Sequence, residues 1–328
     1  MEHPIDARRA VWTRYWAQGA THSCGGSYGS RYEGALAQFW RAAFGALAPG
    51  RACSTSPPAT ARCRSCWPIS IPRAWLECDA VDLAALAPAW FRAAGAKRAA
   101  PACASTASRR PRRCPSAPSQ FDLVMSQYGL EYTDLARSVP ELLRVCAPGG
   151  QVRLVCHHSD ARPVQLAHTE LAHMAWLAAP QGLLDTAQAM IEPVARRHRR
   201  GPRGAGKRRQ ARTRRANASM ICKPRSSSRR RAAIARTSCS KCARRWAPFS
   251  IWACAKAARA DAALATLRGQ LADAALRLEE LRDYALDADA AQALGRTLAQ
   301  GAGKLEIGPM LDQDVLMGWA ISVDRAAR

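Results

Sequence analysis

The chain alternates between segments that have a regular pattern of apolar residues and segments that have none. Residues 32–47 carry apolar side chains at helical spacing, which predicts a helix with one buried face that ends before residues 49–50. That face consists of Leu36, Phe39, Trp40, Ala43, Phe44 and Leu47. Three short, largely apolar segments follow, at residues 78–86, 123–125 and 152–156. Each run is typical of a strand that is buried on both sides.

The rest of the patterned sequence predicts helices and a strand pair. Residues 139–147 form an apolar helical pattern, and a Pro-Gly-Gly turn at 148–150 leads into the third buried strand. Residues 303–328 favour two strands joined by a turn. A leucine stripe at helical spacing predicts core packing or a helix pair. It comprises Leu264, Leu267, Leu271, Leu278 and Leu281, with Ala274 and Ala275 filling the gap. Buried strands that alternate with helices indicate an α/β protein with a parallel sheet.

The composition suggests a different class of protein from the apolar pattern. The 328 residues carry a formal net charge of +24, which is typical of nucleic-acid binders, and the 13 cysteines are compatible with zinc sites or disulfides. Neither feature is spread evenly. Asp and Glu are absent from residues 34–76, 83–121 and 193–260, and these blocks hold most of the cysteines and arginines. The patterned segments between them have mixed charge.

The acid-free blocks interrupt elements that depend on one another, and we interpret them as coding sequence read out of frame. With permitted codons, residues 52–64 shifted by two nucleotides give Val-Leu-Asp-Ile-Ala-Thr-Gly-Asn-Gly, a strand followed by a Gly-x-Gly turn. The same shift turns residues 112–119 and 237–256 into mixed-charge, patterned sequence. The alternative is a genuine basic insertion, because codon freedom weakens any single match.

Three segments together carry a resemblance to a known family. They are residues 79–83 (DAVDL), 121–132 (FDLVMSQYGLEY) and 142–155 (LLRVCAPGGQVRLV). In order and spacing they resemble the class I S-adenosylmethionine-dependent methyltransferases. The resemblance implies a doubly wound, mostly parallel seven-stranded sheet of the Rossmann-like type, partly disrupted here. It also implies S-adenosyl-L-methionine as cofactor and a methyl acceptor that the sequence does not identify.

The resemblance assigns cofactor-binding roles to residues at two strand ends. Asp82, with Leu83 beside it, ends the second strand, where the family's acid accepts hydrogen bonds from the ribose hydroxyls. Ser126, Gln127 and Tyr128 end a later strand, beside the adenosyl and methionyl groups. Asp82 could instead cap a helix. Tyr128, Glu131 and Tyr132 could line the mouth of the site or pack beneath a loop. No catalytic residue is assigned.

The sequence departs from the family at the glycine turn. Pro57 and Pro58 stand where backbone N–H groups would approach the cofactor, and proline has no amide donor. The chain as written is therefore expected to bind the cofactor weakly and to lack activity, even if the family resemblance is correct. A translated pseudogene is one of the hypotheses that remain open.

Metal and nucleic-acid sites are less well supported. Cys63 and Cys66, and likewise Cys239 and Cys242, have zinc-ligand spacing but no convincing histidine partners, so we expect no metal site. A solvated or loop role is favoured for the histidines at 157–158. The basic run at 196–215 lacks interleaved aromatic residues, so stacking on bases is not indicated. A basic nucleic-acid-binding protein without catalysis stays the alternative function.

These observations define the expected organisation. Residues 1–192 form the methyltransferase-like α/β core, with N-terminal helices to residue 50. Residues 193–260 form a basic segment that is disordered or out of frame, and residues 261–328 add a helix and the strand pair that completes the sheet. No apolar run is long enough to span a membrane, and the first residues lack the apolar core of a signal peptide. We expect a cytoplasmic protein with a small-molecule acceptor; nucleic acid is not favoured.

Overall fold

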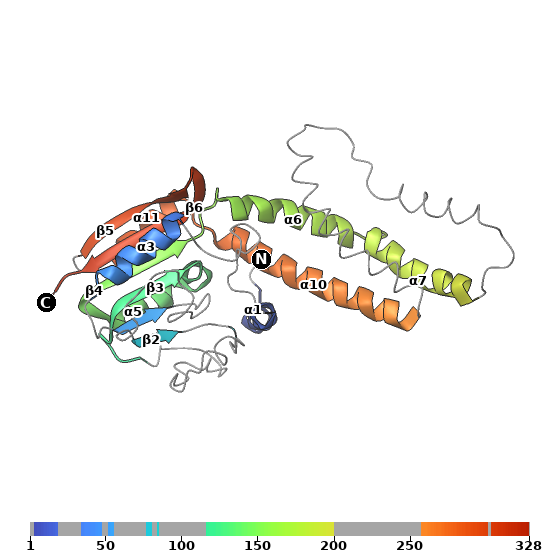
Figure 1. Ribbon diagram of the computed structural model, residues 1–328, viewed down its shortest axis with the longest axis horizontal. Helices are drawn as coiled ribbons and strands as arrows, with labels where there is room; N and C mark the ends of the chain where they lie inside the picture. Colours follow the sequence, from blue (N-terminus) through green and yellow to red (C-terminus); the bar gives the residue numbers. More distant parts are fainter. Residues whose placement is uncertain are drawn as a thin grey trace. The chain divides into compact units, whose positions relative to one another are not determined.

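The structure is a computed structural model. It describes residues 3–18, 34–47, 52–55, 77–80, 84, 116–199, 257–300 and 303–327. The chain divides into two compact units, one formed by Met1–Thr169 with Leu276–Arg328 and the other by Glu170–Ala275. The first unit contains the sheet and the second is helical (Figure 1).

Six strands form one sheet in the first unit. They are β1 (Ala52–Thr55), β2 (Glu77–Ala80), β3 (Phe121–Gln127), β4 (Cys146–Cys156), β5 (Gly303–Asp312) and β6 (Val315–Arg325). Their order across the sheet is β2-β1-β3-β4-β6-β5. The first four strands run parallel to one another, whereas β6 is antiparallel to both β4 and β5.

The expectation of a doubly wound, mostly parallel seven-stranded Rossmann-like sheet is wrong. The described sheet has six strands, it is mixed, and its β5–β6 edge is antiparallel. The physical reason is that the period of an apolar run identifies a strand but carries no information on how many partners it has or in which direction they run. The apolar runs of the sequence located β3 and β4 correctly, but they did not determine the number of strands.

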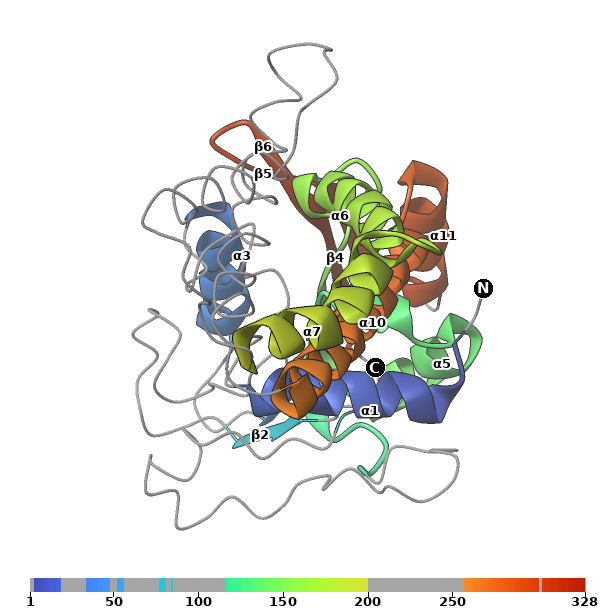
Figure 2. The ribbon, with the colours of Figure 1, turned by 90° about the vertical axis from the view of Figure 1, so that its right-hand side faces the viewer.

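Helices cover both faces of the sheet (Figures 1 and 2). Helix α3 (Gly34–Gly45) packs on one face, where Leu36 and Trp40 contact Leu123 and Val155 in a common apolar cluster. Helices α5 (Leu135–Val145) and α11 (Ala288–Leu298) belong to a second cluster on the other face. The predicted face of the residue 32–47 helix is therefore confirmed, because Leu36, Trp40, Ala43 and Phe44 are all buried.

The hairpin at the sheet edge confirms the predicted C-terminal strand pair. Strands β5 and β6 are joined at Gln313 and Asp314, whose φ angles of 47° and 63° fit the two-residue turn that suits the twist of a hairpin. In β4, the register slips between its pairings with Phe121 and Leu123. The expected Pro-Gly-Gly turn therefore lies inside this strand as a bulge, with Gly149 at a φ of 70°.

Helix α1 (Ile5–Ala17) is held by the last turns of α10 (Ala257–Tyr284), within the first unit. Arg8 forms an ion pair with Glu280, and the Trp12 indole N–H donates to the same carboxylate at 2.8 Å. Arg277 lies 4.6 Å above the centre of the Tyr15 ring, a cation–π contact. Charged groups on α10 therefore fix α1 through specific contacts.

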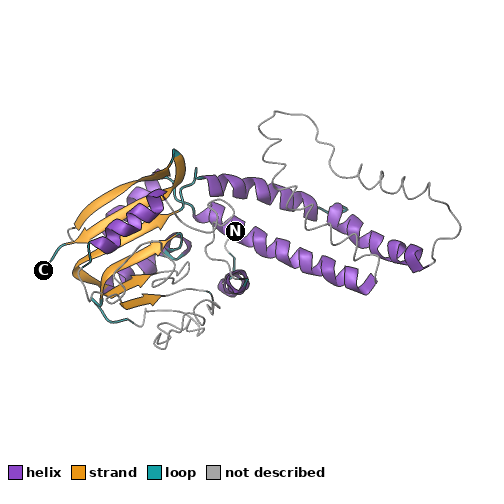
Figure 3. Ribbon diagram, in the orientation of Figure 1, coloured by secondary structure: helices purple, strands orange, loops and turns teal. Residues whose placement is uncertain are grey.

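The second unit is a helical hairpin (Figure 3). It contains the end of α6 (Arg162–Ala178), all of α7 (Leu183–Arg199) and the start of α10. The apolar residues between α7 and α10 include Leu184, Ile191, Leu264, Leu267 and Leu271. The sequence-based expectation of a helix pair along the leucine stripe is thus confirmed for its first three residues. Among the described helices, none is both long and apolar enough to cross a membrane.

Candidate functional site

The carboxyl ends of β3 and β4 meet at one edge of the sheet. Gln127 pairs with Val155 in parallel register, so the residues that follow both strands lie beside each other. The strand order reverses one position along the sheet, between β1 and β3, because the chain runs from β1 outward to β2 and then returns past β1 to β3. In open sheets with parallel strands, ligands bind beyond the carboxyl ends at such a point. The chemistry-bearing side chains were therefore sought at this edge.

Three predicted cofactor-binding residues lie at this edge, and their side chains have partners inside the protein. Ser126 is 1% exposed, and its hydroxyl oxygen accepts the Leu130 backbone N–H at 3.0 Å. The Oε1 atom of Gln127 accepts the Trp40 indole N–H at 2.6 Å. The Tyr128 hydroxyl donates to the Met317 carbonyl oxygen at 3.1 Å. These contacts shape the end of β3 rather than presenting those atoms to a ligand.

Tyr128 has an unusual backbone conformation. Its φ is 54°, in the left-handed region that bulky residues rarely adopt, and its backbone N–H donates to the Val155 carbonyl oxygen at 2.6 Å. The ring stacks on His157, with centroids 4.3 Å apart. Such strain persists only where the surroundings enforce it, and it clusters at ligand sites and active sites. The turn after β3 is therefore a local departure from relaxed geometry at the candidate site.

Glu131 and His157 form a buried pair at the same edge. Their side chains are 0% and 1% exposed, and His157 Nδ1 lies 2.9 Å from Glu131 Oε1. The same oxygen accepts the His157 backbone N–H at 2.9 Å. Glu131 comes from the 3₁₀ turn η1 (Leu130–Tyr132), and His157 directly follows β4. A carboxylate in the core is thus paired with an imidazole through a charge-assisted hydrogen bond.

Tyr132 connects this pair to α1. Its hydroxyl lies 3.4 Å from His157 Nδ1, and its carbonyl oxygen accepts a hydrogen bond of 2.9 Å from Arg8. Trp12 packs its ring edge-on against Tyr132, and Tyr284 of α10 packs against the same ring. An aromatic and charged layer from α1 and α10 therefore surrounds the Glu131–His157 pair.

The pair also affects a neighbouring thiol. Burial raises the pKa of Cys156 well above its ordinary value of 9.0, and the Glu131 carboxylate raises the pKa further by its negative charge and by a hydrogen bond. Cys156 therefore stays protonated in the folded protein. A protonated, buried thiol has neither the charge nor the access of a nucleophile or a metal ligand.

The predicted residues have different outcomes. Asp82, Leu83, Pro57, Pro58 and the cysteine pairs at 63–66 and 239–242 lie outside the described residues. Of the two roles expected for His157, solvated or in a loop, the solvated one is wrong, because its ring is buried against Glu131 and Tyr128, while the residue does lie in the loop after β4. Sequence analysis treated Glu131 only as a possible wall residue. The available signal was the position of Glu131 in a largely apolar and aromatic segment directly after β3. A charged side chain in such a segment is buried only when it is paired.

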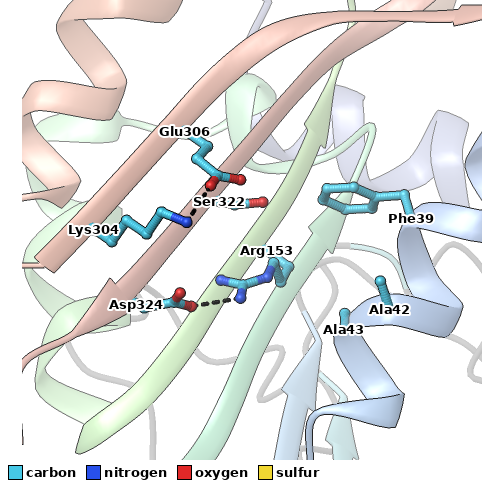
Figure 4. Close-up of a pocket in the computed structure, with 8 residues that line it drawn as sticks. All are labelled: Phe39, Ala42, Ala43, Arg153, Lys304, Glu306, Ser322 and Asp324. Carbon is cyan, nitrogen blue, oxygen red and sulfur yellow. Dashed lines mark hydrogen bonds and ion pairs between the residues drawn. The ribbon is translucent and has the colours of Figure 1, made fainter.

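A hollow lies on the sheet face beside α3 (Figure 4). This cavity of about 230 Å³ is lined by Phe39, Ala42, Ala43, Arg153, Lys304, Glu306, Ser322 and Asp324. Its charged groups neutralise each other, since Arg153 pairs with Asp324 at 2.5 Å and Lys304 with Glu306 at 2.7 Å. It resembles a solvated sheet face more than a ligand site, and we assign no chemistry to it.

Charge and metal ligands were assessed over the same residues. Acidic side chains outnumber basic ones in the described ranges, so the excess positive charge of the chain falls in the other segments. The described residues contain no group of three or more His, Cys, Asp or Glu side chains placed to hold a metal ion.

Comparison with known proteins adds little. No protein-family model matches the chain, and no curated protein matches its sequence. One solved structure, described as a possible exported protein from Bordetella parapertussis, aligns over 95% of this chain and 79% of its own. The two are 13% identical in sequence and the TM-score is 0.38. Similarity at that level supports no conclusion about fold or function.

Proposed function

We propose that the protein is built to bind S-adenosyl-L-methionine at the carboxyl ends of β1 and β3 and to transfer its methyl group to a small-molecule acceptor. The observation that supports this proposal is the reversal of strand order between β1 and β3, which creates a binding crevice in open sheets. Strand β3 ends there in Ser126, Gln127 and Tyr128, the residues that the family resemblance assigns to the cofactor.

The residues at this edge would support such a ligand indirectly. Their hydroxyl, amide and imidazole groups are buried and bonded within the protein, so they would shape the strand end rather than contact the ligand themselves. Within the described residues they form no metal cluster. Gln127, held by Trp40, and Ser126, bonded to the next turn, would fix the backbone at the end of β3 against the cofactor. The Asp82 carboxylate would accept hydrogen bonds from the ribose hydroxyls. When bound, the sulfonium supplies an already activated methyl group, so the protein contributes mainly by positioning the acceptor.

The experiment that tests this proposal is a thermal unfolding titration with S-adenosylhomocysteine. Ligand at about 100 times its dissociation constant stabilises a competent site by about 2.7 kcal/mol. We expect little stabilisation of the chain as written, because Pro57 and Pro58 lack amide donors, and clear stabilisation of a chain in which the reading frame is restored. Absence of any effect on the restored chain would contradict the proposal.

Asp82→Ala in the restored chain supplies the residue-level test. Loss of a charged hydrogen-bond acceptor costs about 1.5 to 3 kcal/mol, which is roughly tenfold to a hundredfold in affinity. Asp160→Ala is the matched control, since this residue follows β4 in the loop before α6 and has no predicted contact with the cofactor. If both substitutions weaken cofactor binding equally, Asp82 does not contact the cofactor.

A further inference from the structure

Strand β5 forms one edge of the sheet (Figures 1 and 3). Among the described strands β6 is its one neighbour, so within the described structure the backbone groups on its other side face no strand. A strand edge of this kind is a template for pairing with another chain. Which chain fits depends on the direction of the free backbone groups and on the side chains beside them.

Pro309 indicates which residues of β5 turn their backbone groups towards the free edge. Proline has no N–H group, so within a sheet it occupies positions whose N–H would face away from the neighbouring strand. Pro309 therefore faces the free edge of β5. Backbone direction alternates along a strand, and the register of β5 with β6 is continuous over residues 303–310. Leu305 and Ile307 therefore also direct their N–H and C=O groups to the free edge.

The charged side chains of β5 complement a second copy of the same strand. Lys304 and Glu306 flank Leu305 and are 72% and 63% exposed. Both lie on the face of the sheet that carries the hollow, where they form an ion pair (Figure 4), while Leu305 packs on the other face. When two such strands pair antiparallel about Leu305, Lys304 of each copy stands opposite Glu306 of the other. Opposite charges at facing positions stabilise an antiparallel pair.

The alternation of charge continues into the sheet. Lys304 stands beside Asp324 in the register of β5 with β6, so Asp324, Lys304 and the second copy's Glu306 form a row of alternating sign. A lysine alone at a strand edge discourages association, but here Glu306 supplies its opposite charge in the second copy. Pairing about Leu305 uses residues 303–307, and Pro309 lies beyond them, where no N–H is needed.

We propose that the β5 edge is the interface of a homodimer, in which two β5 strands pair antiparallel about Leu305 and join the two sheets. Five paired residues in each chain make a small interface, so the dimer dissociates on dilution. The proposal is independent of methyl transfer, because β6 separates β5 from β4 and hence from the candidate ligand edge.

Sedimentation equilibrium of the full-length chain at about 1 to 100 µM measures the dissociation constant of such a dimer. Lys304→Glu and Glu306→Lys each place like charges at both facing positions, so each should raise the dissociation constant at least about tenfold. Asp160→Lys is the matched control, because it changes the net charge as Glu306→Lys does but lies on an exposed loop residue outside the sheet. It should leave the dissociation constant unchanged.

Mixing the two single variants separates pairing between chains from effects within one chain. In a mixed dimer of Lys304→Glu with Glu306→Lys, every facing position again carries opposite charges. We expect the mixture to associate within about threefold of the parent chain. A parent chain that stays monomeric over the whole range would overturn the proposal. The same holds if the single variants dimerise as the parent does, or if their mixture stays monomeric.

Hydrogen exchange locates the interface on the parent chain. The amides of Leu305 and Ile307 should exchange more slowly as the chain concentration rises, because pairing engages their N–H groups. The amides of the neighbouring β6 serve as the reference, since they lie inside the sheet in both states. Dimerisation without added protection at Leu305 and Ile307 would show that the chains meet at another surface, which overturns the proposal.

Discussion

Trp40 of α3 donates its indole N–H to Gln127 Oε1 at the end of β3, with the two atoms 2.6 Å apart. Both side chains are buried, at 1% and 7% exposure. The bond therefore fixes a helix to the strand end where the candidate ligand crevice begins. A buried amide oxygen without a hydrogen-bond partner is costly. Trp40 therefore stabilises the fold through this hydrogen bond as well as through apolar packing.

Trp40→Phe should accordingly destabilise the protein by more than a surface substitution does. The unpaired Gln127 oxygen costs about 1 to 3 kcal/mol, and the smaller ring leaves a cavity that adds to this. Urea denaturation followed by circular dichroism measures the change. Trp176→Phe is the control, since Trp176 is 62% exposed and its replacement should shift the free energy of unfolding by less than about 0.5 kcal/mol. Equal effects would show that the hydrogen bond is unimportant.

The Trp40–Gln127 contact also shows what the sequence could and could not predict. Helical spacing placed Trp40 on a buried face, and an apolar run placed Gln127 at a strand end, so both positions were predictable. The contact itself was not, because the partners are 87 residues apart and periodicity carries no information on pairing. Strand number failed for a related reason, since long unpatterned segments separate β1, β2 and β3.

The ion pair between Arg8 and Glu280 provides a test of how α1 is held. The two side chains are 11% and 3% exposed, and breaking one partner of a buried pair typically costs about 3 to 5 kcal/mol. We expect Arg8→Met to release α1, which hydrogen exchange of the α1 amides would report as lost protection. The double variant Arg8→Met/Glu280→Met should recover part of the loss, because no charge is left unpaired.

Arg9 supplies the matched control on the same helix. Its partner Asp6 is 86% exposed, so Arg9→Met should leave exchange in α1 almost unchanged. If Arg8→Met and Arg9→Met behave alike, α1 is held by its aromatic contacts with Tyr132 rather than by charge.

The raised pKa of Cys156 predicts that the free energy of unfolding falls at alkaline pH. Burial and the Glu131 carboxylate raise the pKa of this thiol well above 9.0 in the folded state, whereas in the unfolded chain it ionises near pH 8.5. The stabilisation is therefore fully present below about pH 8.5 and is lost as pH rises towards the folded pKa, because the unfolded state gives up its proton first. The slope is at most about 1.4 kcal/mol per pH unit for one proton.

Urea unfolding at several alkaline pH values measures this slope, and Cys156→Ala should reduce it. Burial also raises the pKa of Cys146, partly offset by Arg325, so Cys146 keeps a smaller alkaline dependence in the variant. Cysteines whose pKa is the same in both states contribute no slope. Identical slopes in the parent and in Cys156→Ala would mean that the thiol ionises equally in both states.

The candidate site was partly predictable, and its central pair was not. The apolar run at residues 123–125, together with the family resemblance, placed Ser126, Gln127 and Tyr128 at the end of a strand, where the structure has them. His157 follows an apolar strand and was expected to be solvated or to lie in a loop, since nothing in its neighbourhood indicates a buried anion. Only the fold brings Glu131 beside it, from a 3₁₀ turn that follows a different strand.

The reading frame gives the last prediction, and it can be tested on the coding DNA. If the acid-free blocks are shifted text, the alternative frame encodes Gly-x-Gly between α3 and β2, where the chain has Pro57 and Pro58. Strand β1 lies between β2 and β3 and has the sequence Ala-Cys-Ser-Thr. The shifted text supplies Val-Leu-Asp-Ile there. Codons that do not permit Gly-x-Gly in this interval would refute the frame hypothesis. They would leave residues 56–76 as a genuine proline-containing segment, and the weak cofactor binding expected of the written chain would then be a property of the natural protein.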